Sequence, residues 1–155
     1  MVEYSHMTEG EEERIYDLIA RAFNEYVAPI YSNEGVEYFL GMISPKGLRE
    51  LNEGKSSFVI VARQVNELIG MIAVREESHI ALIFIDSEYQ RRGIGKNLIN
   101  KALTICLNRD PKMRAITVSS SPNLKSFYEE IGFKAKGEEV DECGMRFAPM
   151  QKTID

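Results

Sequence analysis

The sequence predicts one mixed α/β domain spanning residues 1–155. Three observations predict it. Strand-like and helix-like hydrophobic patterns alternate along the chain, no linker, repeat or low-complexity stretch interrupts them, and 155 residues is the length of one ordinary domain. Hydrophobic residues make up 44% of the chain, which excludes intrinsic disorder. The expected core is large, because a chain of this length buries about two-thirds of its unfolded surface.

The first quarter of the chain is predicted to hold a strand and a helix. Val2–Met7 has a strand-like pattern, and a helical period of apolar residues then runs from Thr8 or Glu9 to Tyr26. Acidic residues 11–13 fall in the first turn, where the helix dipole favours negative charge, and we expect them to be solvated. The predicted buried stripe consists of Ile15, Leu18, Ile19, Ala22, Phe23 and Tyr26.

Two shorter helices are predicted next. Pro29 ends the first helix, Gly35–Met42 forms the second, and Ser44-Pro45 has the pattern of an N-cap and first residue of a third, which runs to Leu51. The aromatic and acidic side chains of this region either line a substrate cleft, where they would favour a cationic amine, or pack on the sheet. They are Tyr26, Tyr31, Glu34, Glu37, Tyr38 and Phe39.

Three consecutive strands follow, Ser57–Arg63, Leu68–Arg75 and Ser78–Ile85, all rich in Val and Ile. Their short polar connections require an antiparallel meander. The remaining elements alternate between helix and strand, and Gly132 provides the left-handed stop of the last helix. These elements are a helix at Gly93–Leu107, a strand at Arg114–Ser119, a helix at Asn123–Ile131, and closing strands at Phe133–Val140 and Met145–Gln151.

Charge and composition exclude several functional classes. The net charge of −5 argues against a nucleic-acid partner, because phosphate binding normally requires a basic face. No apolar run approaches the roughly 20 residues of a membrane-spanning helix, and the N-terminus lacks a signal-peptide profile. Cys106 and Cys143 make neither a disulfide framework nor a metal-ligand spacing, and Cys106 is expected to be a buried hydrophobe. A cytoplasmic, metal-free protein is expected.

The turn between the third central strand and the following helix predicts an anion site. The first amides of a helix have no internal partner, and Gly93 and Gly95 leave them open to close approach. Arg91, Arg92 and Lys96 add positive charge, so the pattern predicts a phosphate or pyrophosphate site. The alternative is a glycine-rich helix start that packs tightly against a neighbour. Dinucleotide and P-loop motifs are both incomplete here.

This turn also resembles a known family. Gln90-Arg91-Arg92-Gly93-Ile94-Gly95 is similar to the Gln/Arg-x-x-Gly-x-Gly/Ala signature of the GNAT-type N-acetyltransferases. Residues 119–133, which end in Phe-Tyr-Glu-x-x-Gly-Phe, are similar to the family's second hallmark. The order of elements agrees along nearly the whole chain. The resemblance implies the GNAT fold, in which a mostly antiparallel sheet is splayed into a V and flanked by helices.

The resemblance further implies that acetyl-CoA is the cofactor. Its pyrophosphate would rest at Gln90 and on the amides of Arg91, Arg92, Gly93, Ile94, Gly95 and Lys96. Its pantetheine arm would pair with the backbone of Ile83, Phe84 and Ile85, which the splayed sheet leaves open. Asn123 would be a further cofactor contact, although the family's usual asparagine position is Ser121 in this chain.

Two catalytic residues are implied in the same way. Tyr128 matches the family's frequent general acid, which protonates the departing thiolate; the alternative is a core tyrosine. His79 stands where some relatives place a glutamate base; the alternative is a strand-end histidine with a structural hydrogen bond. Because alternate residues of a strand face the same side, we expect one face to be shared by His79, Ala81, Ile83 and Ile85.

The expected function is acetyl transfer from acetyl-CoA to a primary amine, by direct attack in a ternary complex. The acceptor stays open among a polyamine, an aminoglycoside, an amino acid, a peptide N-terminus and a lysine side chain, and a homodimer is compatible with the family. The alternative is a non-catalytic acyl-CoA-binding or sensory module, which turnover would distinguish.

Overall fold

A mixed sheet organises the chain, and its strands are ordered β1-β2-β3-β4-β5-β8-β6, with β7 paired to β8. The computed structural model describes residues 1–142 and 144–154, without the side chains of Tyr26, Ile30, Met42 and Glu142. The strands are β1 (Val2–His6), β2 (Phe58–Gln64), β3 (Glu67–Arg75), β4 (His79–Ile85), β5 (Ala115–Ser120), β6 (Lys134–Ala135), β7 (Val140–Glu142) and β8 (Met145–Thr153).

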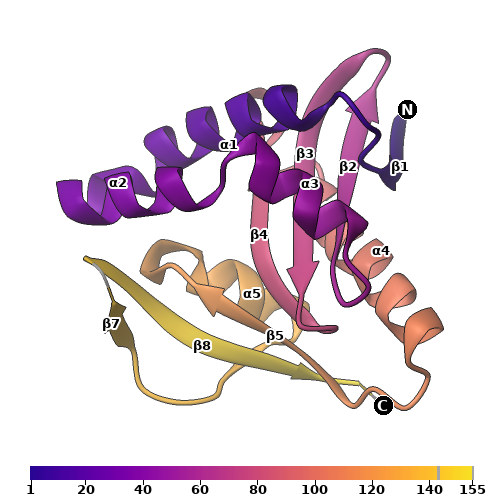
Figure 1. The fold of residues 1–155 in the computed structure, drawn as a ribbon. Coiled ribbons are helices and arrows are strands. Elements are labelled where there is room, and N and C mark those ends of the chain that lie inside the picture. The colour runs from indigo at the N-terminus through magenta and orange to yellow at the C-terminus, as the bar shows by residue number, and fades with distance from the viewer. Residues whose placement is uncertain (143, 155) are drawn as a thin grey trace.

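Helices cover both faces of the sheet and create two hydrophobic cores. Helices α1 to α3 lie on one side, and α4 and α5 lie on the other (Figure 1). No helix in the described ranges has the length and apolar character needed to cross a membrane. The helices are α1 (Glu12–Tyr26), α2 (Asn33–Met42), α3 (Pro45–Glu53), α4 (Ile94–Arg109) and α5 (Lys125–Ile131), with short 3-10 turns η1 (Ala28–Ile30), η2 (Ser87–Tyr89) and η3 (Pro122–Leu124).

The antiparallel meander β2-β3-β4 is confirmed, but a bulge changes its faces. In the β3–β4 ladder Val74 pairs with Ile80, whereas Ala73 pairs with Leu82, so Ala81 is an extra residue in β4. Ile80 and Ile83 therefore both face the core beside α4. The expectation that His79 shares a face with Ile83 and Ile85 is wrong, because a side chain next to Ile80 points to the opposite side, toward α1 to α3.

The sheet splits between β4 and β5, as the resemblance implied. These strands run parallel and pair only at His79–Thr117 and Ile80–Val118. Beyond Ile80 they diverge, while β5 pairs along its whole length with β8. Figure 1 shows the two arms of the V, with β1 to β4 in one arm and β5 and β8 in the other.

Several boundaries differ from the prediction for local reasons. Helix α1 begins at Glu12 instead of Thr8 or Glu9, because Gly10 adopts a φ of +96° that no helix contains. The predicted strand Phe133–Val140 is replaced by the short strands β6 and β7, since the exposed residues 136–139, three charged residues and a glycine, carry no alternating apolar pattern. Pro122 begins the 3-10 turn η3, and α5 starts after it at Lys125.

The acidic start of α1 is buried, which corrects the expectation that it is solvated. Glu11 is 7% exposed and Glu12 is 4% exposed, whereas Glu13 is exposed. The Arg63 guanidinium on β2 donates to both carboxylate oxygens of Glu11, with 2.7 Å from Nη2 to Oε1. The Thr8 amide and hydroxyl donate to the same Oε1, at 2.8 and 2.7 Å. These bonds fasten the start of α1 to the sheet.

The hydrogen bonds from Arg63, with smaller help from Thr8 and against the cost of burial, lower the pKa of Glu11 to about 2. Because the folded-state pKa lies below the ordinary carboxyl value, the stabilisation is complete above about pH 4.5 and is lost as the pH falls toward 2.

We expect Glu11→Gln to lower the free energy of unfolding by about 2–4 kcal/mol at pH 7, since it leaves a largely buried arginine without its partner. The difference from the unmodified protein should shrink at pH 3.5, where part of the ion-pair stabilisation is already lost. Urea denaturation at both pH values measures it, with exposed Glu13→Gln as the matched control. Equal effects of the two substitutions at pH 7 would contradict this account.

Candidate active site

A cavity of about 500 Å³ passes through the split between β4 and β5. Its walls come from both layers of the fold. Phe39 and Leu48 line it from the side of α2 and α3, and Leu124 and Tyr128 line it from the side of η3 and α5. Ala81, the bulged residue of β4, lines the wall between the two layers. The cavity thus exists because β4 and β5 separate after two backbone pairs.

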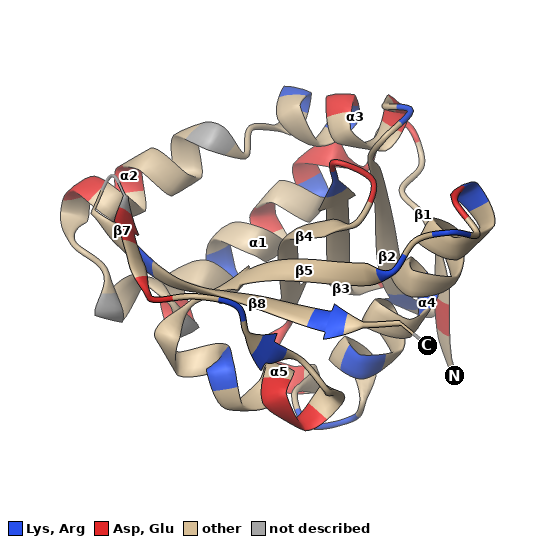
Figure 2. Ribbon diagram, turned by 90° about the horizontal axis from the view of Figure 1, so that it is seen from below, with Lys and Arg blue, Asp and Glu red and all other residues tan. Residues whose placement is uncertain are grey.

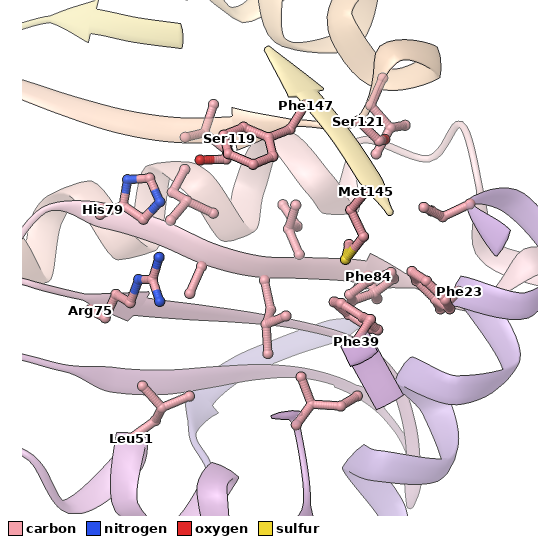
Figure 3. Close-up of a pocket in the computed structure, with 18 of the residues that line it drawn as sticks. Phe23, Phe39, Leu51, Arg75, His79, Phe84, Ser119, Ser121, Met145 and Phe147 are labelled. Carbon is pink, nitrogen blue, oxygen red and sulfur yellow. The ribbon is translucent and has the colours of Figure 1, made fainter. Parts of the chain in front are cut away.

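One end of this cavity is aromatic. The rings of Phe23 and Phe39 stack with their centroids 4.1 Å apart, and Phe84 meets both rings edge-on at 6.4 and 6.0 Å. Figure 3 shows these three rings gathered beside Met145. Phe84 and Met145 are only partly buried, so they present apolar surface to the cavity.

Of the aromatic and acidic residues expected either at a substrate cleft or against the sheet, the described aromatic residues line the cavity and the acids do not. Tyr31, Tyr38 and Phe39 line the cavity. Glu34 and Glu37 are exposed and are not part of its wall. Tyr26 was expected in both the α1 stripe and the cleft, but its side chain lies outside the described part of the chain.

The end of the cavity opposite the aromatic rings is polar and contains His79. Its Nδ1 lies 2.8 Å from Thr117 Oγ1, across the last backbone pairs of β4 and β5. Burial lowers the pKa of His79, and the nearby Arg75 cation lowers it further against the opposing effect of Glu76. His79 is therefore neutral at pH 7. In the tautomer whose Nδ1–H donates to Thr117 Oγ1, Nε2 is the ring nitrogen that can accept a proton from a ligand.

Arg75 was not singled out by the sequence, although it lies directly across from His79 in the β3–β4 ladder. The Arg75 guanidinium extends toward the imidazole in Figure 3 and lines the cavity. Its place follows from the predicted strands once the hairpin register is known, because residues paired across a ladder point to the same side.

Tyr128 on α5 is 2% exposed and lines the cavity. Its ring is fixed edge-on between Phe127 and Phe133, with centroids 5.1 and 5.4 Å away. Burial raises the pKa of its hydroxyl, which therefore stays protonated. Within the described residues this hydroxyl has no hydrogen-bond partner. The residue packs as a core tyrosine and also lines the cavity, and its role as general acid stays a prediction.

The N-terminus of α4 is open, and its two glycines serve different purposes. Gly93 is the N-cap, with a φ of +78° and no side chain to cap the helix. Apart from its own chain neighbours, no atom of the described residues lies within 4 Å of the place that a Cβ would occupy. A Cβ on Gly95 would instead lie 2.9 Å from Phe127 Cζ. The anion-site interpretation therefore fits Gly93, and the tight-packing alternative fits Gly95.

Basic residues surround this helix start. Arg91, Arg92 and Lys96 are exposed, and the Arg92 guanidinium lies over the Tyr89 ring at 5.1 Å. Elsewhere in the fold, Lys and Arg are interspersed with Asp and Glu (Figure 2). The open amides and this local positive charge together can hold a diphosphate.

The end of β4 connects this helix start to the cavity. Ile83, Phe84 and Ile85 pair with β3 on one edge and lie beyond the last β5 pair on the other. The side-chain amide of Gln90 donates from Nε2 to the Ile85 carbonyl at 2.9 Å, so Gln90 holds the turn against β4.

The turn before α5 is held by its own side chains. The Ser121 hydroxyl donates to Asn123 Oδ1 at 2.8 Å. Ser121 lines the cavity, whereas Asn123 does not and does not cap α5. At this turn the structure therefore places Ser121, not Asn123, beside the cavity.

Neither a cysteine nor a metal-binding cluster contributes to this cavity among the described residues. Cys106 is 1% exposed, as expected, and burial raises the pKa of its thiol to about 11. Cys143 lies outside the described residues. Among residues 1–142 and 144–154, no cluster of His, Cys, Asp and Glu could hold a metal ion.

Comparisons with known proteins agree with this geometry. Residues 27–154 match the family model described as an acetyltransferase (GNAT) domain. The chain is 30% identical over 102 residues to a peptidyl-lysine N-acetyltransferase, YjaB, of Salmonella typhimurium, covering 61% of this chain and 67% of that protein. It is 26% identical over 95 residues to an uncharacterized N-acetyltransferase, YitH, of Bacillus subtilis, covering 61% of this chain but only 32% of that protein.

Among solved structures, the fold is similar to that of the PaiA N-acetyltransferase of Thermoplasma acidophilum in complex with coenzyme A. The TM-score is 0.81, the identity is 21%, and the match covers 99% of each chain. At this identity the likeness concerns the fold alone.

Proposed function

The chain belongs to the acetyltransferase (GNAT) family, and from this membership we propose that it transfers the acetyl group of acetyl-CoA to a primary amine. The observation that carries the proposal is the cavity through the split sheet, with the bare N-terminus of α4 at the outer end of β4. The PaiA N-acetyltransferase, whose fold is similar, is described in complex with coenzyme A.

The residues present fit this cofactor. The open amides from Gly93 to Lys96, with Arg91 and Arg92 beside them, supply donors and positive charge for the diphosphate. The N–H and C=O of alternate strand residues point to the same edge, and the Asp86 amide bonds the Ile69 carbonyl of β3, so Phe84 also faces β3. Ile83 and Ile85 therefore face the open edge of β4, and we propose that their backbone groups, more than those of Phe84, pair with the pantetheine arm. The Ile85 carbonyl already accepts from the Gln90 side chain, and its second lone pair can accept a further hydrogen bond. Asn123 remains a proposed contact at the edge of the site.

Acetyl-CoA supplies an activated thioester, and the chain supplies the proton transfers. His79 is neutral at pH 7 and accepts the proton that the amine must lose before its nitrogen lone pair can form the new bond to carbon. Tyr128 donates a proton to the sulfur as the carbon–sulfur bond breaks. We further propose that backbone amides near the split between β4 and β5 polarise the carbonyl.

Direct attack by the amine in a ternary complex is the proposed order of events. A covalent acetyl-enzyme route requires an ionisable, reachable nucleophile. Cys106 is fully buried, and its raised pKa keeps it protonated at neutral pH. A cytoplasmic location stays part of the proposal.

Cofactor binding is tested with two matched glycines. Gly93 and Gly10 both have positive φ and open space around the Cβ position. We expect Gly93→Ala and Gly10→Ala each to cost about 1–2 kcal/mol of stability through backbone strain. Only Gly93→Ala should weaken CoA binding, by about 10-fold or more, since its methyl group covers the helix amides. Calorimetry measures this, and absence of CoA binding by the unmodified protein would refute the proposal.

Turnover is tested at Tyr128. We expect Tyr128→Phe to lower kcat by about 100-fold or more while CoA affinity and stability stay unchanged, because the ring remains and only the proton donor is lost. Release of free thiol from acetyl-CoA with a panel of amines measures it, with Tyr16→Phe on α1 as the control. CoA binding without thiol release on any amine would identify a sensory module instead of an enzyme.

A further inference from the structure

We infer that the acceptor is an amino acid with a large apolar or aromatic side chain, whose carboxylate is held by Arg75. This inference rests on the proposed function, since it assigns the acceptor for the same cavity. Two features carry it: the charges of the cavity wall, and the arrangement of its polar and aromatic ends along β4.

The charges of the wall favour an anionic group over a polycation. Among the described side chains that line the cavity, none is Asp, Glu or Lys, and Arg75 is the one permanent charge. The described residues provide no salt bridge or hydrogen bond to the Arg75 guanidinium. A polyamine or aminoglycoside would bring several positive charges to a wall that has no described carboxylate to receive them, and would meet the Arg75 cation.

Arg75 and His79 are spaced for the two groups of one amino acid. They pair directly across the β3–β4 ladder, and cross-strand partners have Cβ atoms about 5 Å apart. In Figure 3 both side chains lie at the same end of the cavity. The α-amine and α-carboxylate share one carbon, so Arg75 can hold the carboxylate while the amine faces His79. A guanidinium is well suited to bind both carboxylate oxygens.

The aromatic end accommodates the side chain. Because Ala81 is an extra residue, His79–Phe84 matches four steps of β3, from Arg75 to Met71, and the strand advances by roughly 13 Å at 3.3 Å per step. Arg75 reaches into this span from one end, and the rings of Phe84 and Phe39 with Met145 close it at the other. Ala81 lies between them and its small side chain leaves the middle open. An amino acid centred over Ala81 with a large apolar side chain fills this space.

The inference is tested by comparing acceptors that differ in one group. Thiol release is measured with L-phenylalanine, glycine, L-phenylalaninamide, spermidine and Nα-acetyl-L-lysinamide. We expect the highest kcat/KM for L-phenylalanine, since glycine lacks the apolar body and the amide lacks the carboxylate. Titration of L-phenylalanine into the CoA-loaded protein provides a binding readout that does not depend on turnover.

Two substitutions test which residue binds the carboxylate of the acceptor and which binds its side chain. Arg75 is exposed, so water screens its charge, and Arg75→Gln should raise KM for L-phenylalanine by about 3- to 10-fold and leave KM for L-phenylalaninamide nearly unchanged. Phe84→Ala should raise KM for L-phenylalanine but not for glycine. Arg114→Gln, an exposed arginine outside the cavity wall, is the control and should change neither value.

The outcomes separate this inference from the proposed function. Higher kcat/KM for spermidine or for Nα-acetyl-L-lysinamide would overturn the amino-acid acceptor while leaving the acetyltransferase intact. Equal effects of Arg75→Gln on L-phenylalanine and its amide would overturn the role of Arg75. Failure of the unmodified protein to bind CoA would overturn both proposals together.

Discussion

The early end of the β4–β5 ladder is the constraint on which the rest of the structure depends. Two parallel backbone pairs, at His79 and Ile80, hold the strands together before they separate. The same pairs fix His79 against Thr117, and the separation opens the cavity that reaches Tyr128. A longer ladder would satisfy more backbone groups within the protein, but it would close the space between the two layers of helices. The open edge of β4 is therefore the structural basis of the proposed cofactor site.

Features that depend on local sequence could be predicted. The three strands of the meander, the Ser44-Pro45 start of α3 and the stop at Gly132 follow from patterns within a few residues, and the structure contains each of them. The open start of α4 at Gly93 was predicted for the same reason, because a helix N-terminus without a side-chain cap is a property of its own turn.

Features that depend on residues far away in the sequence could not be predicted. Glu11 looked like a solvated residue of a helix start until β2 placed Arg63 against it. The bulge at Ala81 is set by the register with β3, and it moved His79 to the side opposite Ile83. The same register brings Arg75 beside His79, which no pattern within β3 alone reveals. Gly95 could not be separated from Gly93 without knowing that Phe127 packs on it.

Amide hydrogen exchange, followed by NMR with and without coenzyme A, tests the central role of the open β4 edge most directly. The account predicts that CoA slows exchange at backbone amides in residues 81–85 and at the start of α4, while amides of β2, which is paired on both edges, keep their rates. Unchanged exchange along residues 81–85 in the CoA-bound protein would show that the cofactor lies elsewhere and would contradict the account.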